Sequence, residues 1–183
     1  MLYIMRHGRT DWNDLRKLQG RTDIPLNDAG REMAEAARKE YADVHFDICF
    51  CSPLIRARET AEIVLRDRNI PIVPDDRLKE MSFGECEGLE NSFGISDCKV
   101  NVLFREPEKY TDLPEGAESL EELFARTGEF LREKADPLLA EGKDVLIVGH
   151  GAMNSSIVCQ RKGLPVSQFW SAGIESCRLM ELP

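Results

Sequence analysis

Residues 3–13, YIMRHGRTDWN, contain an apolar run that stops abruptly at a basic triplet. The run from Leu2 to Met5 is typical of a short buried strand, and Arg6-His7-Gly8 follows with polar residues directly behind it. Arginine offers a planar set of donors that suits phosphate, and histidine can be a nucleophile or a proton carrier near neutral pH. Glycine lets the backbone bend close to a ligand. The stretch therefore predicts a strand that ends at an anion-binding edge of a sheet.

The composition bounds the class of protein and its partners. With 183 residues, of which 42% are hydrophobic and 31% charged, the chain is predicted to form one globular domain over residues 1–183. The net charge of -9 argues against nucleic acid and against an anionic membrane surface as partners. Residues 1–60 hold ten basic and ten acidic side chains, so basic charge is richest around the opening stretch. An acidic protein with a local basic site favours a small anionic ligand.

The sequence carries no visible targeting or metal-binding pattern. No apolar run approaches the roughly 20 residues that cross a bilayer, and no basic segment or cleavage site follows Met1, so we expect a cytoplasmic protein. The six cysteines form no C-x-x-C pair and the three histidines lie far apart. We therefore expect free thiols, no metal and no other cofactor, while the oligomeric state stays open.

The order of predicted elements indicates the fold class. Strands are expected at 2–5, 47–51, 70–73, 144–148 and 177–182. Helices are expected after an N-cap at Asn27, from Ser52-Pro53, near 98–104, from a capping box at Ser119 to Pro137 or Leu139, and over 152–160. This alternation predicts an α/β sandwich with a mainly parallel sheet, in which Pro71 moves the third strand to an edge.

Two segments are predicted to lack regular structure. Residues 11–26 read as a polar loop. Residues 84–117 contain four glycines and two prolines with little periodicity, and only a short helix near 98–104 interrupts them. A loop of this length in a compact domain is usually functional, so we expect the segment at about 84–117 to cover the substrate.

Chemically active side chains follow four of the predicted strands. Arg6 and His7 end the first, Arg56 lies in the first turn after the second, Glu80 follows the third, and His150 ends the strand at 144–148. Ligands of an open parallel sheet bind beyond the carboxyl ends of its strands, so these groups are expected to meet at one edge. His45 precedes a strand and is expected to be structural or solvated.

This set suits phosphoryl transfer from a phosphomonoester. Arginines and helix N-termini neutralise the phosphate oxygens, and an imidazole can attack phosphorus in line to form a phosphohistidine. A carboxylic acid can protonate the leaving alkoxide and later deprotonate the water that regenerates the enzyme. Arginine and histidine supply the positive charge, so the scheme requires no metal.

The chain resembles the histidine phosphatase superfamily, in its cofactor-dependent phosphoglycerate mutase-like branch. Five blocks in the family's order carry the resemblance: RHG (6–8) with Thr10, Trp12, Asn13, QGRTD (19–23) and PLNDAG (25–30); CSPLIRARETA (51–61); LKEM (78–81), FGE (83–85) and EG (87–88); PEG (114–116) with ES (118–119); and VGHG (148–151). The resemblance implies a three-layer α/β/α fold of the phosphoglycerate mutase-like kind. It also implies that no metal takes part.

The resemblance assigns a role to each matching residue. His7 would accept the phosphoryl group, Glu80 would donate the proton, and His150 would belong to the catalytic set. The phosphoryl group would be held by Arg6, Asn13, Arg56 and His150. Thr10 and Gln19 would line the entrance and contact the substrate. The residues themselves leave Glu85 and Glu87 open as alternatives to Glu80.

Two positions depart from the family pattern. Arg9 stands where Glu or Gln is usual, and it would either favour a more anionic substrate or point to solvent. Cys86 stands where Trp is common, which would loosen the packing below Glu80.

Three activities remain open on this evidence. The first is a phosphomonoesterase that hydrolyses small phosphorylated metabolites and releases inorganic phosphate. The second is a 2,3-bisphosphoglycerate-dependent phosphoglycerate mutase, and the third is a non-catalytic module that binds phosphorylated ligands. The resemblance implies that mutases carry an additional covering segment, and few basic residues (Lys99, Arg105, Lys109) are available in 84–117 to hold a second acidic group. The phosphomonoesterase is therefore the prediction, and its natural substrate stays open.

Overall fold

A five-stranded sheet forms the centre of the computed structural model, which describes residues 1–95 and 97–183. The strand order is β3-β2-β4-β1-β5, and all neighbours are parallel except β1 and β5. The strands are β1 (Leu2–Arg6), β2 (Ile48–Cys51), β3 (Ile72–Pro74), β4 (Val145–Gly149) and β5 (Leu179–Leu182). The prediction of a mainly parallel sheet with the third strand at an edge is confirmed.

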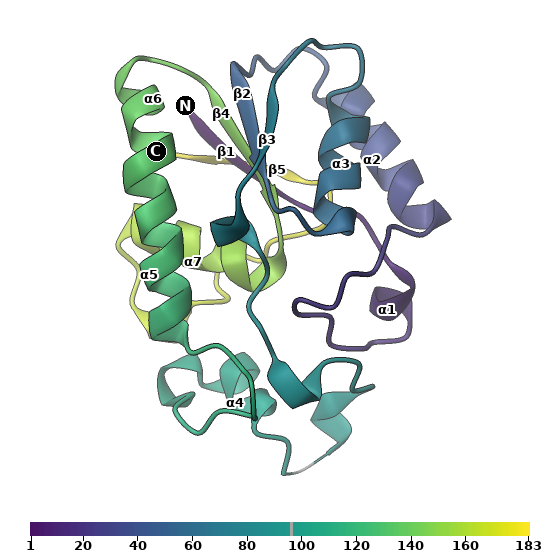
Figure 1. Cartoon of the computed structure of the whole chain (residues 1–183), viewed down its shortest axis with the longest axis vertical. Coiled ribbons are helices and arrows are strands. Elements are labelled where there is room, and N and C mark those ends of the chain that lie inside the picture. The colour runs from purple at the N-terminus through teal and green to yellow at the C-terminus, as the bar shows by residue number, and fades with distance from the viewer. Residues whose placement is uncertain (96) are drawn as a thin grey trace.

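Helices cover both faces of this sheet and complete a three-layer α/β/α sandwich (Figure 1). One face carries α2 (Asp28–Glu40) and α3 (Ile55–Val64), and the other carries α5 (Leu120–Phe130), α6 (Asp136–Ala140) and α7 (Gly151–Lys162). Each helical layer has its own apolar core, because alternate strand residues point to opposite faces. Ile4 and Ile147 belong to the core beneath α5 and α7, and Met5 belongs to the core beneath α2 and α3.

The strand register brings the two predicted histidines together. Arg6 of β1 is paired with Gly149 of the fully buried strand β4, and the His7 amide donates to the Gly149 carbonyl at 2.9 Å. His7 and His150 therefore follow adjacent positions at the carboxyl edge of the sheet.

The predicted capping residues are confirmed at two helices and displaced at a third. Asn27 accepts from the Gly30 amide at 2.9 Å, and the Ser119 hydroxyl and Glu122 form a reciprocal capping box. The helix expected from Ser52-Pro53 begins only at Ile55. Its first amide is satisfied by Asp23 at 2.7 Å, while the Ser52 hydroxyl accepts from the Leu54 amide before the helix starts.

Other boundaries differ from the predictions for local reasons. The loop expected at 11–26 contains a helical turn, α1 (Asp11–Asp14), which Thr10 and Asn13 stabilise through a capping box. The helix from Ser119 continues through a π-helical turn at Leu131–Ala135 into α6 and ends at Ala140. The last strand begins two residues later than expected, because Cys177 takes a positive φ of 56° that interrupts extended pairing.

The segment 84–117 lies beyond the carboxyl ends of the strands (Figure 1). It contains α4 (Val100–Arg105) and short 3₁₀ turns, and residue 96 within it is outside the described residues. Backbone hydrogen bonds fasten its start to the loop after α1, from the Gly88 amide to the Leu18 carbonyl (2.7 Å) and from the Leu18 amide to the Leu89 carbonyl (3.1 Å). This segment therefore borders the site described below.

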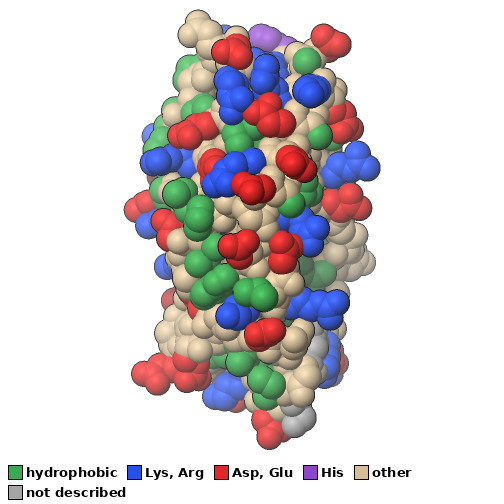
Figure 2. Space-filling view, turned by 90° about the vertical axis from the view of Figure 1, so that its right-hand side faces the viewer, with side chains coloured by type: hydrophobic (Ala, Val, Ile, Leu, Met, Phe, Trp, Pro, Cys, Tyr) green, Lys and Arg blue, Asp and Glu red, His purple; other side chains and the backbone are tan. Residues whose placement is uncertain are grey.

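The outer surface of α2 and α3 mixes basic, acidic and hydrophobic side chains (Figure 2). Ion pairs such as Arg31–Glu59 and Arg66–Glu35 link the two helices there. Among the described residues, none of the helices is both long enough and apolar enough to cross a membrane.

Candidate active site

A cavity of about 310 Å³ opens at the carboxyl edge of the sheet. Six of the residues predicted for the site line it: Arg6, His7, Asn13, Gln19, Arg56 and Glu80. His150 is fully buried against His7, with ring centroids 5.2 Å apart. We call Arg6, His7, Arg56 and His150 the basic cluster.

The tautomer of His7 follows from its hydrogen bonds. Nδ1 lies 2.6 Å from the Gly8 carbonyl oxygen, which can only accept, so Nδ1 carries the proton. Nε2 is then left with a lone pair and accepts from Arg56 Nε at 3.3 Å. The Thr60 hydroxyl accepts from the Gly8 amide at 3.1 Å, which fixes the turn after His7. The ring nitrogen that faces Arg56 is thus the one that carries the lone pair.

Arg56 is held in place by backbone carbonyls on the loop after α1. Its Nη1 donates to the Thr22 carbonyl at 2.8 Å and its Nη2 to the Gly20 carbonyl at 2.5 Å, while its side chain is fully buried. Two fixed contacts and the bond to His7 leave the guanidinium little freedom, so its position depends on the shape of residues 20–22.

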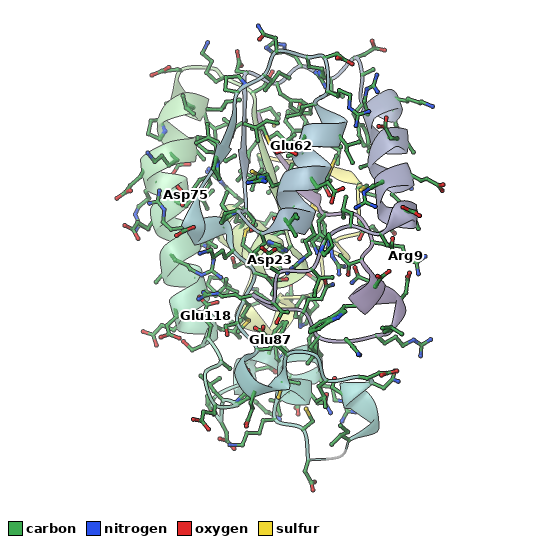
Figure 3. All side chains as sticks on the ribbon, turned by 45° about the vertical axis from the view of Figure 1, so that its right-hand side comes forward. Arg9, Asp23, Glu62, Asp75, Glu87 and Glu118 are labelled. Carbon is green, nitrogen blue, oxygen red and sulfur yellow. The ribbon has the colours of Figure 1, made fainter. Side chains whose placement is uncertain are left out.

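Glu87 determines the shape of that loop. Its carboxylate accepts from the Arg21 amide (3.0 Å), the Thr22 amide (3.0 Å), the Thr22 hydroxyl (2.5 Å) and the Phe83 amide (3.1 Å). Gly20 has a positive φ of 54°, and a Cβ there would lie 2.2 Å from Glu87 Oε1. Glu87 therefore supports Arg56 from behind and does not line the cavity. Asp23 anchors the same loop to the start of α3, and Figure 3 shows Asp23 and Glu87 below that helix.

Three nitrogen atoms of the basic cluster are buried without a hydrogen-bond partner among the described residues: Arg6 Nε and both ring nitrogens of His150. Buried polar atoms are nearly always paired in folded proteins, because an unpaired one costs about 1–3 kcal/mol. Arg6 Nε is a donor, and so is at least one ring nitrogen of His150, so the basic cluster has donors left for a ligand with acceptor oxygens.

Burial keeps both histidines neutral at neutral pH. Desolvation and the charges of Arg56 and Arg6 lower the pKa of His7 well below its ordinary value. The pKa of His150 is also lowered well below its ordinary value, first by desolvation and then by its neighbours Arg56, His7 and Arg6. Burial lowers the pKa of Arg56 to about 10, so this arginine stays a cation at neutral pH.

Glu80 caps the helix that follows His150. Its Oε1 accepts from the Met81 amide (2.8 Å) and the Met153 amide (2.9 Å), whereas its Oε2 accepts only from the Ala152 amide (3.1 Å). Oε2 therefore makes fewer hydrogen bonds than Oε1, and the Glu80 side chain lines the cavity. Glu85 and Glu87, the alternatives left open by the sequence, do not line the cavity.

Asn13, Gln19 and Thr10 form a small network at the cavity wall. The Thr10 hydroxyl donates to Gln19 Oε1 at 2.8 Å and contacts Asn13 Oδ1 at 3.1 Å. Asn13 and Gln19 line the cavity, but Thr10 is fully buried behind them. Thr10 was expected at the entrance; in the structure its hydroxyl serves as the N-cap of α1, one layer behind the cavity lining.

Arg9 points away from the cavity. It forms an ion pair with Asp14 at 2.5 Å, its side chain is 53% exposed, and Figure 3 shows it at the outer edge of the molecule. Of the two readings of this unusual residue, the structure supports the solvent-facing one.

One group of possible metal ligands occurs among the described residues, at the opposite edge of the sheet. His45, Asp47 and Asp144 offer ligand atoms within 4.8 Å of one another. Lys143 pairs with Asp47, and the chain's amino terminus pairs with Asp144. His45 is exposed, in agreement with its prediction as structural or solvated.

Sequence reasoning missed the side chains that complete the cavity away from the basic cluster. Phe83, Phe104 and Trp170, which we call the aromatic wall, line it together with Leu18 and Lys17. Phe104 lies in the irregular segment and Trp170 lies 20 residues after His150, so no periodicity connects them. The role of Glu87 was also missed, although its block matched the family.

The fold and the site together define a class: a three-layer α/β protein with an anion-accepting cavity at the carboxyl edge of its sheet. A family model for the histidine phosphatase superfamily (branch 1) matches residues 2–183, and the chain belongs to this family. The family resemblance inferred from the sequence is thereby confirmed.

Similar proteins include both phosphatases and mutases. The chain is 36% identical over 153 residues to a 2,3-bisphosphoglycerate-dependent phosphoglycerate mutase of Cytophaga hutchinsonii, covering 82% of this chain and 72% of that protein. It is 37% identical over 163 residues to the uncharacterized phosphatase PhoE of Bacillus subtilis, covering 87% and 76%. Among solved structures, Bacillus stearothermophilus YhfR superposes with a TM-score of 0.83 at 34% identity, covering 93% and 83%. The general phosphatase or mutase chemistry is thus supported.

Proposed function

We propose that the chain is a phosphomonoesterase that hydrolyses small phosphorylated metabolites through a phosphohistidine on His7. The observation that carries this proposal is the set of buried, unpaired nitrogens around His7 Nε2. A phosphoryl group offers acceptor oxygens to the unpaired donors of Arg6 and His150, and its negative charge would lie beside the guanidinium groups of Arg6 and Arg56. Asn13 and Gln19 border the same space and would contact the phosphoryl group and the substrate.

The reaction follows from the positions of these groups. His7 Nε2 attacks phosphorus and the bond to the ester oxygen breaks, while Glu80 Oε2 gives its proton to the leaving alkoxide. Glu80, now a carboxylate, takes a proton from water, whose oxygen attacks the phosphohistidine and releases inorganic phosphate. Arg6 and Arg56 hold the equatorial oxygens throughout, so the scheme assigns no step to a metal or cofactor.

The lining of the cavity favours hydrolysis over the mutase reaction. A mutase must hold a second acidic group of its bisphosphate, which calls for several cations outside the basic cluster. Lys99 pairs with Asp112 at 2.7 Å and Lys109 pairs with Glu106, and neither lines the cavity. Outside the basic cluster, Lys17 is the cation that lines the cavity. The segment 84–117 contributes an aromatic ring, Phe104, to the cavity lining.

The mutase remains the second candidate, because relatives of this chain bear that name. The experiment that separates the two compares phosphate release with interconversion of 2- and 3-phosphoglycerate in the presence of 2,3-bisphosphoglycerate. We expect release to be the faster reaction, and interconversion well above release would favour the mutase. A non-catalytic module would show neither reaction.

The nucleophile is tested by replacing His7. The variant His7→Ala should lose phosphate release from 4-nitrophenyl phosphate by about 10³-fold or more. Appreciable activity in a folded His7→Ala protein would remove the assignment.

A further inference from the structure

The cavity changes character away from the basic cluster. Its remaining lining includes four large apolar side chains, namely Leu18, Phe83, Phe104 and Trp170, and Lys17 contributes one ammonium group. The Lys17 ammonium lies 5.8 Å from the ring centroid of Trp12, so part of its charge already meets an aromatic face. The substrate's leaving alcohol must occupy this part of the cavity once its phosphoryl group reaches His7.

The rings of the aromatic wall are held by one another and by α4. Trp170 Nε1 donates to the Leu103 carbonyl at 2.8 Å, which ties the indole to α4. The indole stacks on Phe104 with centroids 5.3 Å apart and an interplanar angle of 21°, and it meets the buried ring of Phe169 edge-on at 4.7 Å. The ring centroid of Phe83 lies 6.1 Å from that of Phe104. Such fixed rings offer a flat ligand contact area at little cost in side-chain entropy.

The same surface is unfavourable for a second anionic group. A carboxylate or phosphate placed against these rings would lose hydration without gaining several donors in return. A cavity of about 310 Å³ is also at the small end of ligand sites, enough for a phosphoryl group and a compact ring system.

Resting on the phosphomonoesterase activity proposed above, we propose that the preferred substrate is a phosphate monoester whose alcohol carries a planar aromatic or heteroaromatic group. This group stacks along the aromatic wall, and Trp170 is the residue that selects it. Esters that carry such a ring should have a higher kcat/KM, because a ring that binds to the wall also orients the ester oxygen toward Glu80.

The test compares phosphate esters whose leaving groups are all simple alkoxides. Their intrinsic reactivities are therefore similar, and a difference in kcat/KM reports how well the cavity binds the alcohol. Benzyl phosphate carries the ring, n-propyl phosphate lacks it, and 3-phosphoglycerate replaces it with a carboxylate. We expect kcat/KM of the wild-type protein for benzyl phosphate to exceed that for each of the others by about tenfold or more. A preference for n-propyl phosphate or 3-phosphoglycerate would overturn the proposal.

Variants of the wall identify the selecting residue. Trp170→Ala should bring the benzyl-to-propyl ratio of kcat/KM close to one, whereas Trp170→Phe should keep most of the ratio. Both variants lose the bond to the Leu103 carbonyl, so the comparison separates the ring from the hydrogen bond. Trp12→Phe, at a tryptophan outside the cavity lining, is the control and should leave the ratio unchanged. A ratio that is equal in wild type and Trp170→Ala would also overturn the proposal.

If Trp170→Ala fails to fold, Phe104→Leu provides a second variant of the wall and should lower the same ratio. The two proposals fail in different ways. If the phosphomonoesterase proposal fails, no ester releases phosphate in a manner that depends on His7. If only the aromatic selection fails, His7-dependent release occurs but does not favour the ring.

Discussion

The basic cluster and the aromatic wall share one cavity but are built from different parts of the chain. The cluster comes from strand ends and from the first turn of α3, and three of its four side chains, His7, Arg56 and His150, are almost completely buried. The wall comes from the segment after Glu80 and from the residues after α7. The cluster leaves donors without partners, whereas the indole nitrogen of the wall is paired. The comparison suggests that the sheet supplies the chemistry and the connecting segments supply selectivity.

The largest effect on the chemical side is expected at Glu80. Glu80→Gln removes the proton donor but keeps an oxygen for the backbone amides, so kcat/KM for benzyl phosphate should fall by about 10³-fold. The value for 4-nitrophenyl phosphate should fall far less, because nitrophenolate leaves without a proton. Equal losses for the two esters, measured in steady-state assays, would contradict the role of Glu80 as acid.

Arg56 is expected to have the next largest effect. Arg56→Ala removes donors from the phosphoryl group, so kcat/KM should fall by about 10²–10³-fold for aromatic and aliphatic esters alike. Arg56→Lys should not restore activity, since a single ammonium cannot reach both loop carbonyls and the ligand. A loss confined to benzyl phosphate would assign Arg56 to the wall instead.

Glu87 is expected to act through Arg56 and to have a smaller effect. Glu87→Gln replaces one acceptor oxygen by a donor that faces the Thr22 or Arg21 amide, so the loop shifts and kcat/KM should fall by up to about 10²-fold. In an Arg56→Ala background the same change should cost little, because the group that it positions is already gone. The exposed residue Glu90, changed to Gln, is the matched control. Independent, additive losses would refute the link.

The smallest effect is expected in stability as a function of pH. The pKa values of His7 and His150 are lowered in the folded state, so the unfolded chain binds more protons below about pH 6.5. The stability is therefore complete above that pH and declines as the pH falls toward the lowered values, by up to about 1.4 kcal/mol per pH unit for each histidine. Thermal unfolding between pH 7.5 and 5.5 should show a smaller decline for His150→Asn than for the wild type. Parallel declines would show that His150 is not buried in its neutral form.

The sequence predicted the basic cluster far better than the wall. Arg6, His7, Arg56 and His150 could be placed because each follows an apolar strand, and parallel strands end at one edge. For the acid, the sequence left Glu85 and Glu87 as alternatives to Glu80. These residues lie in a loop, and a loop has no regular repeat from which the direction of a side chain can be predicted. The start of α3 was misplaced because the long-range cap from Asp23 is invisible in local sequence.

Phe104 and Trp170 escaped prediction for a related reason. Their rings stack although 65 residues separate Phe104 from Trp170 in the sequence. Neither has a chemical group that marks it as functional, and an aromatic residue in a helix or loop is usually a packing residue. Only the three-dimensional arrangement shows that they border the cavity.

The most direct test of the account is to trap the covalent intermediate. Wild-type protein is mixed with 4-nitrophenyl phosphate, quenched in alkali within milliseconds to preserve phosphohistidine, and mapped by peptide mass spectrometry. Catalysis through a phosphohistidine predicts a single phosphoryl group on His7, a larger trapped fraction in Glu80→Gln, and none in His7→Asn. A phosphoryl group on another residue, or turnover without any trapped intermediate in either active protein, would contradict it.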